Sequence, residues 1–104
     1  MKKYIILTLM LTIATAGCIT QEKQGTGFQN PIVIEASHEE EGIAKEYDWL
    51  TKNACTNNEG IADLESQELQ ENNGHWFDIM TMTCNNGQKE TYYFQIDSFF
   101  GKWE

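Results

Sequence analysis

The sequence predicts an α+β domain in which one helix packs on a small, mostly antiparallel sheet, with the element order β-α-β-β-β. Three observations lead to this prediction. A polar cap precedes an apolar stripe at helical spacing over residues 39–53. Two copies of Asn-Asn-Gly, at 72–74 and 85–87, follow runs of strand-forming residues. Cys55 and Cys84 are placed to join the end of the helix to the second turn.

Residues 1–17 are predicted to be a signal peptide. Lys2 and Lys3 form a basic start, and the following residues 4–16 are uncharged and apolar. This segment is shorter than the roughly 18 residues that indicate a spanning helix. A basic start with a short apolar segment is typical of bacterial export signals.

The motif Thr15-Ala16-Gly17-Cys18 follows this segment and resembles the lipobox of bacterial lipoproteins. Ala16 and Gly17 match the lipobox, whereas Thr15 stands where that family usually has leucine. The resemblance implies that Cys18 becomes the first mature residue and carries a lipid. The lipid would anchor the protein at the cell membrane or outer membrane, with its domain in the periplasm or outside the cell. In the alternative, cleavage after Ala14-Thr15-Ala16 leaves Cys18 as a free thiol on a secreted protein.

Residues 18–30 are predicted to be a flexible tether, because this stretch is mostly polar and contains two glycines. The folded domain is expected to span residues 31–104. Pro31 precedes a short β-branched run, Ile32-Val33-Ile34, which predicts a first strand.

A helix is predicted over Glu39–Asn53. Ser37 is expected at the N-cap with Glu40 three residues later, which is the pattern of a capping box. Four apolar residues then follow at spacings of four, three and four and form one stripe: Ile43, Tyr47, Leu50 and Ala54. This stripe is the face expected to pack on the sheet.

Residues 64–70 are predicted to form a strand, with a second short helix as the alternative. The apolar residues Ile61, Leu64 and Leu69 fit neither period well. The Asn72-Asn73-Gly74 turn favours a strand because a second such turn follows it. A three-residue loop at this turn would place Leu69 opposite Phe77.

The last two strands are predicted to form a hairpin with a two-residue loop at Asn86-Gly87. This register pairs Ile79 with Phe94 and Thr81 with Tyr92 on a core face. The opposite face would carry a mixed set of aromatic and methionine residues: Trp76, Met80, Met82 and Tyr93. These four residues are either a partner surface or are buried under the aromatic tail at Phe99 and Phe100.

The C-terminal sequence Tyr92-Tyr93-Phe94-x-Ile96-Asp97-Ser98-Phe99-Phe100-Gly101 resembles the tail of small, uncharacterised, exported bacterial proteins with a YYFDISxFFG-type ending. The resemblance implies no particular activity. The aromatic tail residues are expected to fold back over the sheet edge or onto the helix.

Cys55 and Cys84 are predicted to form a disulfide, because export brings them into an oxidising compartment. The bond would close a loop of about 30 residues and contribute roughly 3–4 kcal/mol in the chain-entropy model. Metal ligation and redox catalysis are the rival interpretations. Both are disfavoured because neither cysteine lies in a C-x-x-C motif.

From Cys18 onward, five lysines, no arginine and 16 acidic residues give a formal net charge of −11. Nucleic-acid binding depends on lysine and arginine contacts to phosphate, so this composition argues against it. The charge is compatible with a basic envelope protein as partner, or with solubility alone.

The sequence indicates no catalytic residue, metal ligand or cofactor, and the protein is not expected to be an enzyme. His38 and His75 are placed at element ends, and G-x-S-x-G is missing. The His38-Glu39-Glu40-Glu41 start of an H-E-x-x-H motif has Gly42 where the second histidine is needed. Asp78 is the acidic residue of most interest, because it lies in mid-strand.

The expected function is that of a membrane-anchored lipoprotein with a small extracytoplasmic binding domain. One alternative is an acidic inhibitor of a basic envelope enzyme such as lysozyme. Thr83-Cys84-Asn85-Asn86-Gly87 is similar to the Cys-then-Gly hairpin of lysozyme-inhibiting lipoproteins, but their Ser-Gly-x-x-Tyr-type loop is absent. A second alternative is a structural spacer without a specific ligand.

Overall fold

The computed structural model describes residues 24–103 and confirms the predicted α+β class and element order. The predicted signal peptide, Cys18 and the start of the tether lie outside these residues. The elements are β1 (Ile32–Val33), α2 (Glu39–Asn53), β2 (Ile61–Asn72), β3 (His75–Cys84) and β4 (Lys89–Gln95). No helix among residues 24–103 is long and apolar enough to cross a membrane.

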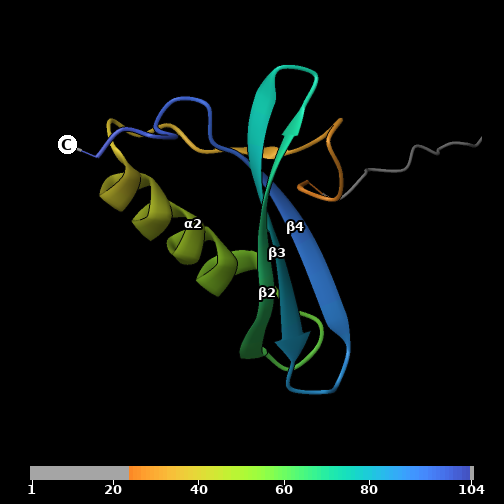
Figure 1. Cartoon of the computed structure of the whole chain (residues 1–104). Coiled ribbons are helices and arrows are strands. Elements are labelled where there is room, and N and C mark those ends of the chain that lie inside the picture. Colours follow the sequence, from red (N-terminus) through yellow and green to blue (C-terminus); the bar gives the residue numbers. More distant parts are fainter. Residues whose placement is uncertain (1–23, 104) are drawn as a thin grey trace, which may run out of the picture.

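The four strands form one sheet in the order β1-β4-β3-β2, and α2 lies across one face of it (Figure 1). The pairs β2–β3 and β3–β4 are antiparallel, while β1 runs parallel to β4. This order leaves β2 at one edge of the sheet.

The ambiguous segment before the first turn is a strand, as predicted, and it extends well beyond residues 64–70. Asn73 and Gly74 both have positive φ, 52° and 83°, which is the geometry of a two-residue type I′ loop. The predicted three-residue loop is therefore wrong, and Leu69 lies opposite Asp78 rather than Phe77.

Two one-residue register shifts in β2 explain why its apolar residues fit no period. The shifts fall between Ile61 and Asp63 and between Leu64 and Ser66. They bring Ile61, Leu64 and Leu69 opposite Cys84, Met82 and Asp78, which all lie on the helix-facing side. An extra residue in one strand moves every later side chain to the other face, so simple alternation is lost.

The register of the last hairpin is also shifted by one residue from the prediction. Met80 lies opposite Tyr92, and three residues, 85–87, form the loop. The Cys84 N–H donates to the Gln88 carbonyl at 2.7 Å, and Gly87 takes a φ of 93°. Asn85 is held by the neighbouring loop, since its N–H donates to the Gly60 carbonyl at 2.8 Å.

This shift exchanges the two faces of β3. The helix-facing side carries Asp78, Met80 and Met82 beside Tyr92 and Phe94 of β4, and these residues are buried. The predicted core face with Phe77, Ile79 and Thr81 instead lies on the opposite side of the sheet. The error follows from the loop, because a one-residue slip inverts the facing of a strand.

Residues 24–30 pack against the sheet, so the folded domain begins before Pro31. The Phe28 ring makes edge contacts with Phe77 and Tyr93, at centroid distances of 4.9 and 5.0 Å. The Gly25 carbonyl accepts a hydrogen bond from the Tyr93 N–H at 2.8 Å. This part of the predicted flexible tether thus covers the face opposite α2 (orange in Figure 1).

Helix α2 has the predicted bounds, but its cap lies one residue later than predicted. His38 is the N-cap, and its Nδ1 accepts a hydrogen bond from the Glu41 N–H at 3.4 Å. The Glu41 carboxylate in turn accepts from the Ser37 N–H at 2.9 Å. The arrangement resembles a capping box, except that the Glu41 carboxylate reaches the N–H of the residue before the N-cap rather than that of the N-cap itself.

The aromatic tail folds back onto the domain, as predicted. Phe99 is fully buried against the first turn of α2, and Phe100 stacks on Trp76 at a centroid distance of 4.5 Å. The Glu39 N–H also donates to the Lys102 carbonyl at 2.6 Å, which ties the start of the helix to the tail.

Replacing Gly42 with alanine will destabilise the domain by about 1–2 kcal/mol, because overpacking outweighs the gain in helix propensity. A Cβ at this position would lie 2.4 Å from atoms of the Phe99 ring. Urea denaturation of the variant measures the loss. In a Phe99→Ala background the clash is gone and the same substitution should stabilise; stabilisation in the wild-type background would contradict the prediction.

Candidate functional site

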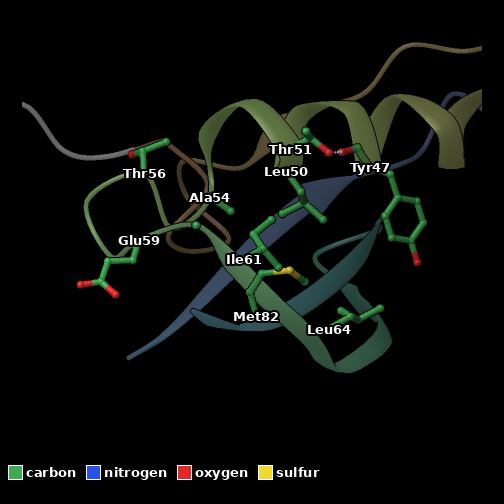
Figure 2. A pocket seen from close by; sticks show the side chains of 10 residues that line it. Tyr47, Leu50, Thr51, Ala54, Thr56, Glu59, Ile61, Leu64 and Met82 are labelled. Carbon is green, nitrogen blue, oxygen red and sulfur yellow. Dashed lines mark hydrogen bonds between the residues drawn. The ribbon is translucent and has the colours of Figure 1, made fainter. Parts of the chain in front are cut away.

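An apolar cleft of ≈ 700 Å³ lies between α2 and the start of β2 (Figure 2). Leu50 from the helix and Ile61 and Met82 from the strands point toward one another in its interior. Tyr47 and Leu64 lie farther from this group (Figure 2), and both are accessible to solvent, which places them on the open side. The lining residues are Tyr47, Leu50, Thr51, Ala54, Thr56, Glu59, Gly60, Ile61, Leu64 and Met82.

The cleft exists because the apolar stripe of α2 does not point at the centre of the sheet. Leu50 and Ala54 are buried, whereas Ile43 and Tyr47 are 37% and 41% exposed. The buried face of the helix instead contains Gly42, Glu46 and Leu50. The prediction that the whole stripe packs on the sheet is therefore wrong. The close approach of Phe99 to Gly42 accounts for this rotation of the helix, since a side chain at 42 would not fit.

The polar groups of the cleft are few and lie at its rim. The Thr51 hydroxyl donates to the Tyr47 carbonyl at 2.9 Å, so this donor is already used (Figure 2). Glu59 also belongs to the lining, from the loop before β2, but its carboxylate points away from the interior (Figure 2). Such a mostly apolar lining can hold an apolar group, which is the usual character of a protein's ligand pocket.

A pair of buried carboxyl groups joins α2 to β3 beside the cleft. Glu46 is completely buried, and Asp78 is 8% exposed. Neither carboxyl oxygen of Glu46 makes a hydrogen bond of normal geometry with residues 24–103. Burial raises the pKa of Glu46 to about 10, with further contributions from the neighbouring Asp78 and from Glu39. Burial also raises the pKa of Asp78.

Neither carboxyl group of this pair lines the cleft. Asp78, the acid singled out from the sequence, is therefore turned into the helix–sheet interface rather than toward a bound molecule. A general acid must reach the substrate atom that it protonates, and this placement does not provide that reach. The pair can hold a proton between helix and sheet, and it couples the stability of the domain to pH.

The predicted disulfide between Cys55 and Cys84 is present and fully buried. Glu90 supports it by accepting hydrogen bonds from the Cys55 N–H at 2.8 Å and from the Tyr92 hydroxyl. The two sulfurs and a Glu90 oxygen lie within 4.8 Å of one another. Because the sulfurs are bonded to each other, they do not offer the thiolates that a metal requires.

The four residues of the predicted partner surface do not all share a face, because Tyr93 pairs with Ile79 and lies on the side of the sheet opposite to Trp76, Met80 and Met82. Met80 and Met82 are 0% and 2% exposed and lie under α2. Tyr93 packs on Phe28 on the other side of the sheet, and Trp76 stacks on Phe100. The predicted shared face is therefore wrong for Tyr93, because it depended on the hairpin register. Burial, the other outcome left open above, holds for Met80 and Met82, and Phe100 of the aromatic tail covers Trp76.

Both histidines have structural partners. His38 caps α2, and the His75 Nδ1 lies 2.7 Å from the Asp97 carboxylate at the far end of the β3–β4 hairpin. The two histidines lie in different elements, at the starts of α2 and β3, and neither lines the cleft.

Sequence reasoning missed the cleft and the carboxyl pair. A signal for the pair was present, because Glu46 lies four residues after Gly42 and four before Leu50, on one helical face. The cleft had no such signal, since its inner wall depends on the register shifts in β2.

Comparison of the chain with protein-family models, with curated proteins and with solved structures gave no match in any of the three.

Proposed function

We propose that this protein is an extracytoplasmic binding domain that holds an apolar group of its ligand in the cleft between α2 and β2. The observation that carries the proposal is the open apolar stripe of the helix. Ile43 and Tyr47 stay more than a third exposed although helical periodicity places them with buried Leu50. Apolar surface left open beside a cleft is typical of a binding site.

The sequence motifs and the disulfide support a location outside the cytoplasm. A buried disulfide persists in an oxidising compartment. The lipobox-like motif adds a lipid anchor at Cys18 to this proposal, which would hold the domain at a membrane surface. The exposed side chains at the cleft favour a binding role over a structural spacer. That the protein is not an enzyme stays a prediction.

Nile red, an uncharged apolar dye, will bind the oxidised protein saturably and at one site per chain. Leu64 flanks the open side of the cleft, and Leu64→Gln will weaken dye binding about tenfold. A tenfold loss corresponds to the partial loss of one apolar contact. Fluorescence titration gives the affinity, and circular dichroism checks that the variant folds.

Val33→Gln is the matched control, since Val33 is an exposed apolar residue of β1 outside the cleft. It should leave dye binding unchanged. Dye binding that does not saturate, or that falls equally in both variants, would refute the proposed site.

A further inference from the structure

The outer edge of β2 offers backbone groups for another strand. Among residues 24–103, β2 pairs with β3 and with no second strand. Asn72 and His75 flank a two-residue loop and so form a hydrogen-bonded pair, after which pairs alternate along the ladder. By that alternation the amides of Gln67 and Leu69 point away from β3, toward the open edge.

The two faces of β2 differ in chemistry. On the helix-facing side, Leu64 and Leu69 lie opposite Met82 and Asp78, and Leu69 is 49% exposed. On the other side, Glu68 lies opposite Ile79 and is exposed. A strand added beside β2 would alternate in the same way, with one set of side chains toward the cleft and the next toward acidic residues.

Acidic side chains determine which strand can dock here. Asp63, Glu68 and Glu71 are exposed along β2, and the chain from Cys18 onward carries a net charge of −11. A second copy of this chain would set these carboxylates against one another, and like charges directly opposite are destabilising. Acidic residues on an edge strand also keep it from pairing with a second copy that carries the same charge.

We propose that β2 takes an added strand from a polypeptide in which apolar and basic residues alternate, with the apolar side chains filling the cleft. The basic side chains would lie on the other face beside Glu68 and Asp63. This mode of recognition combines backbone hydrogen bonds for affinity with side-chain pockets for specificity. The inference rests on the proposed function, because it uses the same cleft and names the class of its ligand.

The added strand completes the packing that the isolated domain lacks. A neighbouring strand lies about 4.8 Å from β2 in the plane of the sheet. Its cleft-facing side chains would cover Tyr47 and Leu64, which flank the open side of the cleft. The apolar stripe of α2 would then be buried along more of its length.

A short synthetic peptide of alternating leucine and lysine tests the inference on the oxidised protein. Two peptides serve as comparisons: one with the same composition in separate leucine and lysine blocks, and one with glutamate in place of lysine. Calorimetry at low and high salt gives affinities. Amide hydrogen exchange followed by NMR reports on Gln67 and Leu69, whose N–H groups gain partners only if a strand is added.

The alternating leucine–lysine peptide is expected to bind most tightly, to weaken at high salt and to slow exchange at both amides. Asp63→Asn with Glu68→Gln should weaken it about tenfold at low salt, as expected for two exposed ion pairs. Glu35→Gln with Glu40→Gln removes the same charge from exposed residues outside β2 and the cleft, and it should have little effect.

Peptide binding without protection of Gln67 and Leu69 would overturn strand addition, as would equal binding of the block peptide. Equal weakening by the two double variants would overturn the role of the acidic face. No peptide binding with Nile red binding intact would refute this inference and leave the cleft proposal standing. Loss of dye binding as well would refute both. A dimer joined through β2, seen by scattering, would replace the basic polypeptide with a second copy.

Discussion

Replacing Glu46 with glutamine will stabilise the domain by about 2–4 kcal/mol at pH 7–8. This is the free energy that the wild type loses at these pH values, either by burying the ionised carboxylate or by keeping the carboxyl group protonated. Glu46 is completely buried, and burial raises its pKa from 4.5 to about 10, helped by Asp78 and Glu39. Glutamine has nearly the same shape and carries no proton to lose. Its amide can also donate a hydrogen bond to the Asp78 carboxylate.

The sign of the pH dependence follows from the direction of this shift. A folded-state pKa above the unfolded value means that the folded protein binds the extra proton. The contribution of Glu46 is therefore fully favourable below about pH 4.5 and is lost as the pH rises toward about 10. Wild-type stability should fall across this window, by at most about 1.4 kcal/mol per pH unit from this group.

Urea denaturation at pH 5, 7 and 9 measures the effect. Glu46→Gln should flatten the pH dependence and match the wild type most closely at pH 5. Glu40→Gln, an exposed glutamate on the same helix, is the control and should keep the wild-type slope. An identical slope in the Glu46 variant would show that the buried carboxyl does not titrate in this window.

Replacing both Cys55 and Cys84 with alanine will lower the free energy of unfolding by about 3.5 kcal/mol or more. The bond joins residues 29 apart in sequence, and a loop of that size sets the entropic part of this value. Both sulfurs are buried in the core, so their removal also leaves unfilled volume. A small domain has a net stability of only about 5–15 kcal/mol, so the loss is a large fraction of it.

The expected result is a much lower urea midpoint for the double variant. Reducing agent should lower the wild-type midpoint in the same direction and leave the double variant unchanged. An unchanged midpoint in both tests would mean that helix and hairpin stay joined without the bond.

The disulfide also positions one wall of the cleft. Cys55 follows Ala54, the C-cap of α2, and Ile61 begins β2 opposite Cys84. Reduction would release the loop between them, which carries Thr56 and Glu59 of the lining. Ligand binding and oxidation are therefore expected to be linked, with weaker dye binding in the reduced protein.

The hairpins show where sequence reasoning succeeded and where it failed. Both Asn-Asn-Gly motifs are turns, as their tolerance of positive φ predicts. The loop lengths were exchanged: Asn73-Gly74 closes a two-residue loop, whereas residues 85–87 form three. Local residue preference does not separate these outcomes. The three-residue length of the second loop was decided by contacts of Asn85 and Asn86 with the loop before β2.

The sequence by itself determined the α+β class, the order of the elements, the bounds of α2, and the pairing of Cys55 with Cys84. These features follow from local signals: helical period, capping residues, turn residues and cysteine number. Tertiary structure decided which face of each element is buried. Phe99 packs against Gly42 and turns Glu46 inward, and the register shifts in β2 bring its apolar residues to one side. The cleft arises from the rotation of α2 and the register shifts in β2 together. Which side of each element is buried depends on contacts between residues far apart in the chain, and local signals do not contain these contacts.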